Sequence, residues 1–146
     1  MKSDALQRAL KTNRHTKNVF GGVLPCNWLP KHVTKKKKVA FIVNTDPSDK
    51  DGLHWVAFFF EPQHAFYFDP YGLKPMLKVF KTFLQKRKKY SYFNMRVQGT
   101  GGTCGYHCLY FILSMLKKVK WNLSGDNLEF NDQYVTRISK SHFCLN

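Results

Sequence analysis

The chain has 146 residues, of which 43% are hydrophobic and 16% aromatic, so its composition excludes a disordered polymer and suffices for one compact domain over residues 1–146. No run approaches the roughly 20 uncharged apolar residues of a membrane helix, and the N-terminal residues lack a signal-peptide core, so we expect a soluble protein that is not exported. Four cysteines are too few and too dispersed for a secreted disulfide scaffold. The net charge of +15 points to polyanionic partners.

Hydrophobic periodicity and turn residues predict the order of the secondary-structure elements. In chain order, they are a short helix (4–10), an irregular segment rich in glycine and proline (20–30), strands (39–43, 54–60 and 65–68), an amphipathic helix with a lysine-rich outer face (74–88), a strand (92–97), an apolar core helix (104–116) and a last helix (132–141). The strands are expected to form one sheet, with the apolar helix packed across one face. This is an α+β architecture.

Three short motifs stand where predicted strands give way to turns or to a helix. They are Gly-Leu-His-Trp at residues 52–55, Phe-Asp-Pro-Tyr-Gly at residues 68–72, and Gln-Gly-Thr-Gly-Gly-Thr-Cys-Gly at residues 98–105. Together they supply a histidine, His54, a carboxylate, Asp69, and a cysteine, Cys104. These are the groups that a thiol nucleophile needs, so the sequence predicts a cysteine protease.

The chemistry explains why these residue types occur together. A free cysteine has a pKa of about 8.5, so an adjacent imidazolium is needed to stabilise its ionised form at neutral pH. The thiolate of Cys104 would attack an acyl carbon, His54 would carry a proton to the leaving amine, and Asp69 would hold the ring in the useful tautomer. Because Cys104 begins a predicted helix, the unpaired N–H groups there favour a thiolate and can bind an oxyanion, with the Gln98 side-chain amide as the second donor.

Each motif has a simpler interpretation when it is taken alone. A lone histidine near a strand usually has a structural role, an Asp-Pro-Tyr-Gly run is usually a turn, and a glycine-rich loop before a helix is more often a turn or an anion site. Their joint order, with Trp55 and Gly105 beside them, favours the protease. A zinc site at Cys104, His107 and Cys108 is a further alternative, but the chain lacks a C-x2-C pair, so no metal is expected and Cys108 is interpreted as a core residue.

The three motifs, in this order, resemble those of the adenovirus maturation proteases (adenain) and, more distantly, those of the SUMO-deconjugating proteases. The similarity includes Ala-Phe-Ile-Val-Asn-Thr at residues 40–45 and can be followed over about residues 20–116. It implies a papain-like cysteine protease core in permuted order, with a central mixed or antiparallel sheet. The residues to which it assigns roles are His54, Asp69, Cys104 and Gln98 for catalysis, and Trp55, Trp28 and Gly105 for substrate contact.

The chain also departs from the adenain pattern. Asp69 stands where adenain has Glu, whereas the SUMO proteases have Asp at this position. Adenain is activated partly by a capsid-derived peptide, which forms a disulfide with a cysteine between the carboxylate and glutamine motifs, but residues 70–97 contain no cysteine. That covalent switch does not transfer, whereas a noncovalent activating peptide stays open. The chemistry itself requires no cofactor.

Basic residues are concentrated in two runs. No acidic residue occurs from residue 70 to residue 125, while eleven Lys and Arg do. The members of the two runs are Lys35, Lys36, Lys37, Lys38, Lys86, Arg87, Lys88 and Lys89. We expect them to contact the phosphates of DNA independently of sequence, with an affinity that falls as salt rises. The simpler interpretation is a solvated surface or a nuclear-import signal.

Three functions follow from these observations. The first is a monomeric maturation endopeptidase of a virus or a virus-like element, which acts in the virion and the host nucleus, is stimulated by DNA, and cleaves capsid or core precursors at Gly-Gly or Gly-X-Gly sites. The second is a DNA-binding scaffold on an inactive protease fold. The third is a deconjugase of ubiquitin-like proteins such as SUMO.

Overall fold

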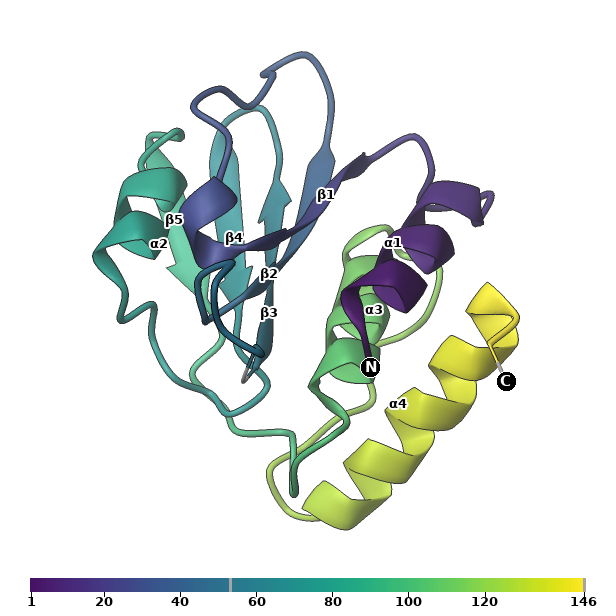
Figure 1. Cartoon of the computed structure of the whole chain (residues 1–146). Helices are drawn as coiled ribbons and strands as arrows, with labels where there is room; N and C mark the ends of the chain where they lie inside the picture. The colour runs from purple at the N-terminus through teal and green to yellow at the C-terminus, as the bar shows by residue number, and fades with distance from the viewer. Residues whose placement is uncertain (53, 146) are drawn as a thin grey trace.

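The computed structural model describes residues 1–52 and 54–145 and is shown in Figure 1. Leu53, within the first motif, lies outside the described residues. The strands of this part of the chain are β1 (Phe20–Pro25), β2 (Val39–Asn44), β3 (Trp55–Phe60), β4 (His64–Phe68) and β5 (Lys89–Tyr92); the helices are α1 (Ser3–Thr12), the short 3₁₀ helix η1 (Cys26–Trp28), α2 (Lys78–Leu84), α3 (Cys104–Met115) and α4 (Leu128–Phe143). None of these helices is long and apolar enough to cross a membrane.

The strands form one mixed sheet in the order β1-β2-β3-β4-β5. The central pairs β2–β3 and β3–β4 are antiparallel, while the outer pairs β1–β2 and β4–β5 are parallel. The prediction of an α+β fold with a mixed sheet is confirmed. The antiparallel register has a functional consequence, since it brings the beginning of β3 next to the end of β4; we call this the catalytic end of the sheet.

Alternate residues of the central strands fill two separate cores. Every residue of β3 is buried. Ala57 and Phe59 belong to the core shared with α3, while Val56, Phe58 and Phe60 belong to the core shared with α2. Successive strand residues point to opposite faces, so a strand covered on both sides reads as a continuous apolar run. In Figure 1, α2 lies on one side of the sheet and α1, α3 and α4 lie on the other.

The segment over residues 20–30 is more regular than predicted. Phe20–Pro25 forms β1, which pairs with β2 with a register shift between Phe20 and Gly22. A Cβ atom at Gly21 would lie 2.6 Å from the Phe41 ring, so this glycine permits close packing and does not mark a break.

Two other predictions were wrong in position. The helix expected over residues 74–88 is shorter and comprises only α2 (Lys78–Leu84). It begins late because Lys74 precedes Pro75 and the backbone of Leu77 is extended. The strand expected over residues 92–97 ends at Tyr92, where β5 finishes. The residues after it run beside the 68–72 motif, since Val97 donates its backbone N–H to the Pro70 carbonyl at 2.9 Å.

The two C-terminal helices differ in their surroundings. Nine residues of α3 are buried, as expected of a core helix, and α4 covers the side of α3 that faces away from the sheet (Figure 1). The predicted last helix exists but is longer, because Asn127 caps its start by accepting the Phe130 N–H at 2.9 Å. α4 therefore extends to the loop that precedes Cys104.

Candidate active site

His54 and Asp69 meet at the catalytic end of the sheet. His54 directly precedes β3 and Asp69 directly follows β4, so the antiparallel pairing brings them together. Nε2 of His54 lies 2.7 Å from Oδ1 of Asp69. The same oxygen accepts the backbone N–H of Tyr71 at 2.8 Å, which helps to hold the carboxylate at the ring nitrogen. The other ring nitrogen, Nδ1, is left for a reacting partner.

Cys104 is the first residue of α3. Thr103, the residue before it, makes no side-chain cap, so the first N–H groups of the helix stay available for an anion. Burial opposes ionisation of the Cys104 thiol, but hydrogen bonding with His54 and with the backbone N–H groups of Trp55 and Gly105 outweighs burial and lowers its pKa. The sulfur is therefore placed where a thiolate is stabilised.

The imidazole responds in the complementary direction. Burial opposes a charge on His54, but hydrogen bonding with Asp69 and Cys104 outweighs burial and raises its pKa to about 9. A lowered thiol pKa beside a raised imidazole pKa favours a thiolate–imidazolium pair at neutral pH. Such a pair can both attack an acyl carbon and protonate a leaving group.

Two residues around His54 were not assigned from the sequence. The Tyr71 ring stacks on the imidazole, with centroids 4.7 Å apart and an angle of 20° between the planes. The Arg96 guanidinium lies over the Tyr71 ring, 5.1 Å from its centroid. Tyr71 belongs to the Asp-Pro-Tyr-Gly motif, so its position two residues after Asp69 could have indicated a place in the site. Arg96 lies in none of the three motifs, and no sequence pattern indicated its position.

Gln98 lies in the loop before Cys104 and is fully buried. Its Nε2 donates to the Thr100 carbonyl at 2.8 Å and approaches the Tyr71 hydroxyl at 3.5 Å, the limit of a hydrogen bond. Its Oε1 has no hydrogen-bond partner among the described residues. One amide N–H of Gln98 therefore has only the weak Tyr71 contact as its partner.

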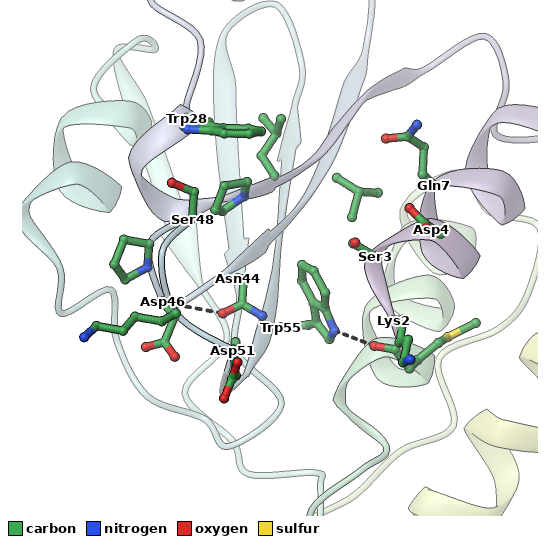
Figure 2. Close-up of a pocket in the computed structure, with 17 residues that line it drawn as sticks. Lys2, Ser3, Asp4, Gln7, Trp28, Asn44, Asp46, Ser48, Asp51 and Trp55 are labelled. Atoms are coloured by element: carbon green, nitrogen blue, oxygen red, sulfur yellow. Dashed lines mark hydrogen bonds between the residues drawn. The ribbon is translucent and has the colours of Figure 1, made fainter.

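A pocket of about 590 Å³ lies beside the catalytic end and is lined by both Trp55 and Trp28 (Figure 2). Trp28 is 62% exposed, whereas Trp55 is mostly buried and donates its indole N–H to the Met1 carbonyl at 3.0 Å. Gly105 does not line this pocket: a Cβ there would lie 3.1 Å from that of Met1 and 3.4 Å from Leu6. Gly105 thus packs close to the N-terminal residues, and its contact with substrate stays a prediction.

The two lysine-rich runs lie away from the catalytic end. Residues 35–38 precede β2 and are exposed, as are Lys88 and Lys89, while Lys86 is half-buried. β2 has six residues. At about 3.3 Å per residue, its length separates residues 35–38 from His54 by about 20 Å.

Arg87 is a correction to the predicted nucleic-acid-binding set. It is only 5% exposed. It donates to the carbonyls of Glu61 at 2.7 Å, Thr34 at 2.7 Å and Val33 at 3.4 Å. These contacts occupy the guanidinium, so it is not available to phosphate. Arg87 instead ties its own lysine-rich run to the segment before the other run, which places the two runs next to each other.

The described residues, 1–52 and 54–145, contain no group of three or more His, Cys, Asp or Glu arranged to hold a metal ion. The zinc site considered at Cys104, His107 and Cys108 therefore has no support. Cys108 is fully buried, and burial raises its pKa well above the ordinary range. A protonated, enclosed thiol is a core residue and a poor ligand.

The sheet, the helix that begins at the thiol, and the His54–Asp69 pair define a papain-like cysteine protease fold. The solved structure of the ASFV pS273R protease shares this fold, with a TM-score of 0.54 and 16% identity over 97% of this chain and 67% of its own. The sequence model of the family described as adenovirus endoprotease matches residues 20–94, just over half of the chain. The chain belongs to that family, which confirms the resemblance.

Curated relatives agree with this assignment. The protease of Ovine adenovirus D serotype 7 (isolate OAV287) is 30% identical over 127 residues, covering 75% of this chain and 63% of the relative. The protease of Bovine adenovirus 4 is 30% identical over 138 residues, covering 79% of this chain and 65% of the relative. The chain thus spans less than two thirds of the length of these relatives.

Proposed function

We propose that the chain is a cysteine endopeptidase that cleaves viral or virus-like precursor proteins at Gly-Gly or Gly-X-Gly sites during particle maturation. The observation that carries the proposal is the meeting of His54, Asp69 and Cys104 at one end of the sheet, with His54 2.7 Å from Asp69 and the pKa of Cys104 lowered. Relatives named Protease occur in adenoviruses, which supports a viral setting. We place the action of the monomer in the virion and the host nucleus, on capsid or core precursors.

In the proposed reaction, the Cys104 thiolate attacks the peptide carbonyl and the carbonyl electron pair moves onto oxygen. The free N–H groups at the start of α3 and the Gln98 amide receive that oxyanion. The His54 imidazolium donates its proton to the amine nitrogen, the C–N bond breaks, and the acyl group stays on sulfur as a thioester. Water then attacks the thioester while neutral His54 takes its proton, which releases the acid and restores the thiolate. Asp69 orients the ring throughout.

The preference for glycine rests on Trp55. In the resembling SUMO proteases, the tryptophan after the catalytic histidine forms one wall of a narrow tunnel over a Gly-Gly backbone. Trp55 lines the pocket beside the catalytic end here, and Trp28 lines the same pocket. A narrow passage between such walls favours residues without a side chain.

DNA stimulation is supported by the position of the lysine-rich runs. Adjacent exposed lysines offer a phosphate-binding surface, and counterion release would make its affinity fall steeply with salt. Because this surface lies at the other end of β2, bound DNA does not cover His54. We therefore propose DNA as an activator and a track, and a noncovalent peptide as a second possible activator.

Labelling with an electrophilic peptide probe that ends in Gly-Gly tests the proposal. We expect the probe to modify Cys104, and Cys104→Ala to abolish both labelling and cleavage while DNA affinity is retained. Cys144→Ala is the matched control, because Cys144 is the exposed cysteine of the chain. Cleavage that survives Cys104→Ala would exclude the assigned nucleophile. Absence of labelling and cleavage in the wild-type chain, with DNA binding intact, would favour the scaffold.

The deconjugase alternative is separated by substrate choice. Fluorescent C-terminal conjugates of ubiquitin or SUMO are compared with a short Gly-Gly peptide, with and without DNA. An endopeptidase cleaves the peptide at least as well as the conjugates. A strong preference for the whole ubiquitin-like protein would assign the chain to the deconjugases.

A further inference from the structure

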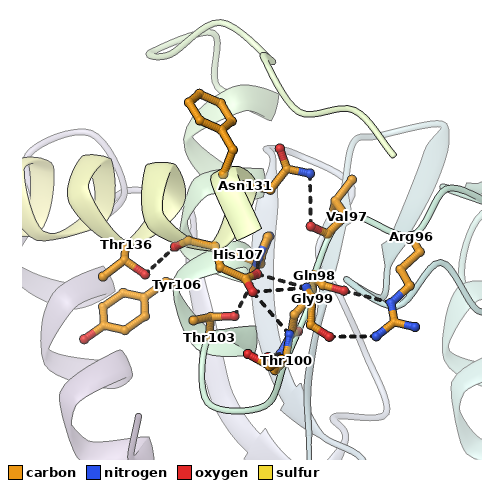
Figure 3. Close-up of polar contacts among 12 residues, drawn as sticks. Arg96, Val97, Gln98, Gly99, Thr100, Thr103, Tyr106, His107, Asn131 and Thr136 are labelled. Carbon is orange, nitrogen blue, oxygen red and sulfur yellow. Dashed lines mark hydrogen bonds and ion pairs between the residues drawn. The ribbon is translucent and has the colours of Figure 1, made fainter. Parts of the chain in front are cut away.

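The carboxylate of Asp132, on α4, binds the loop that leads into the nucleophile helix. It accepts the backbone N–H of Gly99 at 3.1 Å and that of Thr100 at 3.2 Å. It also accepts the Thr103 hydroxyl at 3.1 Å and Nε2 of His107 at 2.9 Å. Figure 3 shows these donors converging from the loop and from α3. One carboxylate thus satisfies donors from four residues, and we call residues 98–103 the oxyanion loop.

The carbonyl groups of this segment are also bound by side chains. Arg96 donates its Nε to the Gln98 carbonyl at 2.8 Å and an Nη2 hydrogen to the Gly99 carbonyl at 2.7 Å. Asn131, next to Asp132 on α4, donates to the Val97 carbonyl at 3.1 Å. The peptide units around Gly99 are therefore fixed through both their N–H and their C=O groups (Figure 3).

Close approach at Gly99 shows that the loop and α4 fit each other. A Cβ atom at Gly99 would lie 2.9 Å from Oδ2 of Asp132 and 3.2 Å from Cβ of Leu128. The absence of a side chain allows the loop backbone to reach the carboxylate. Asp132 also lies outside residues 20–94, the part of the chain matched by the family model.

The Thr103 contact affects the helix that follows. A threonine before a helix normally accepts an N–H from the first turn through its hydroxyl oxygen. Here the hydroxyl donates to Asp132, and Thr103 makes no capping hydrogen bond. The Thr103 side chain therefore does not compete with an oxyanion for the first N–H groups of α3.

His107 contributes a neutral donor to this cluster. It is fully buried, and Nδ1 has no partner among the described residues. Burial lowers the pKa of His107 despite the nearby carboxylate, so the ring is neutral and donates through Nε2. For Asp132, burial opposes ionisation, but hydrogen bonds from His107, Gly99 and Thr100 outweigh burial and lower its pKa. An ionised carboxylate is the state that accepts all these donors.

We infer that Asp132 is a positioning residue for acyl transfer, which holds the oxyanion loop so that the Gln98 amide and the uncapped first N–H groups of α3 converge on one point. This inference rests on the proposed function. The hydrogen bonds of Asp132 go to the loop and to His107, so it acts through the loop. Misplacement of such groups by about 1 Å can cost on the order of 100-fold in rate.

Asp132→Asn tests this role, because it keeps the shape of the side chain but turns one acceptor into a donor that faces N–H groups. We expect kcat for a Gly-Gly peptide to fall about 10- to 100-fold with KM changed less than about threefold. Alkylation of Cys104 by iodoacetamide forms no oxyanion, so its rate is expected to stay within about twofold of wild type. Glu129→Gln, an exposed carboxylate on the same helix, is the matched control and is expected to alter neither rate. A parallel loss of turnover and alkylation, or no loss of turnover, would overturn the inference.

Amide hydrogen exchange gives a readout that does not depend on proteolysis. In the wild-type chain the Gly99 and Thr100 amides are expected to be protected, and Asp132→Asn is expected to remove that protection while Glu129→Gln keeps it. If Asp132→Asn does not fold, Thr103→Val removes a single donor and is expected to lower kcat by a smaller factor with alkylation unchanged. If the wild-type chain cleaves no peptide, the proposed function fails. If the exchange protection of Gly99 and Thr100 is unchanged in Asp132→Asn, the role of Asp132 is excluded whether or not the chain is a protease.

Discussion

The Tyr71 ring lies almost parallel to the His54 imidazole, with 4.7 Å between centroids and 20° between planes. The backbone N–H of the same residue binds the carboxylate of Asp69 at 2.8 Å. One residue therefore restrains both the histidine and its orienting carboxylate. This arrangement gives the first prediction.

Tyr71→Ala is expected to lower kcat/KM about tenfold, while Tyr71→Phe retains most activity. Aromatic stacking contributes about 0.5–1.5 kcal/mol beyond area burial, which corresponds to a factor of about 2 to 13. Steady-state kinetics on a Gly-Gly peptide measure the effect. If Tyr71→Phe lost as much activity as Tyr71→Ala, the hydroxyl near Gln98 and not the stacked ring would be responsible.

His54→Ala is expected to raise the pKa of the Cys104 thiol. Burial opposes the thiolate, and hydrogen bonding with His54 is the largest influence that favours it. Without the ring, burial prevails. The pH dependence of iodoacetamide alkylation should therefore move to higher pH, with a slower rate at pH 7 in the variant. A pH profile that does not move would show that the imidazole has no part in stabilising the thiolate.

Stability is expected to decline as pH rises from 6.5 to about 9, and cleavage is expected to decline as pH passes about 9. The pKa of His54 is raised from 6.5 to about 9 in the folded chain, so its charged form is favoured by folding. A raised pKa contributes stability that is fully present below pH 6.5 and is lost as pH rises through about 9. The imidazolium is also the proposed proton donor to the leaving amine. Peptide cleavage and Tm between pH 7 and pH 10 are the measurements, and a kcat that keeps rising beyond pH 9.5 would contradict this role.

Arg87→Ala is expected to destabilise the fold by about 2–4 kcal/mol, because it removes a buried side chain and the charged donor of the part-buried Glu61 and Thr34 carbonyl contacts. Lys88→Ala is the matched control, an exposed neighbour expected to change stability by less than about 0.5 kcal/mol. Urea denaturation measures both. If Arg87→Ala were as stable as wild type, the contacts to Glu61 and Thr34 would not be structural.

Replacing Lys35, Lys36, Lys37 and Lys38 by Gln is expected to weaken DNA binding and to reduce the dependence of affinity on salt. Each lost phosphate contact lowers the magnitude of the slope of log K against log salt by about 0.9. Cleavage of a short peptide without DNA is expected to be unchanged, because these lysines lie at the other end of β2 from His54. Unaltered DNA affinity would show that DNA binds at another surface of the protein.

The central strands and the nucleophile helix could be predicted from sequence because burial on both sides gives continuous apolar runs, as in β3 and α3. The motif order singled out His54, Asp69 and Cys104, each of which stands at the boundary of such a run, and the structure brings His54 and Asp69 to 2.7 Å. β5 was misplaced because an edge strand that reads Lys-Tyr-Ser-Tyr, with three of its four residues exposed, carries little hydrophobic signal.

The supporting residues were not predictable for a different reason. Asp132 and Gly99 are separated by 33 residues and meet only because α4 packs on α3. Arg87 sits in a lysine-rich run, which in one sequence looks like a solvated surface. Long-range polar contacts of this kind leave no periodicity, so the groups that hold the candidate site are visible only once the chain is folded.

The hydrogen bond between the Trp55 indole and the Met1 carbonyl makes the first residues part of the pocket wall. A variant that lacks residues 1–2 loses the carbonyl that holds the indole and two residues of the pocket lining. Its peptide selectivity should therefore differ from that of the chain with these residues, even though His54, Asp69 and Cys104 are untouched.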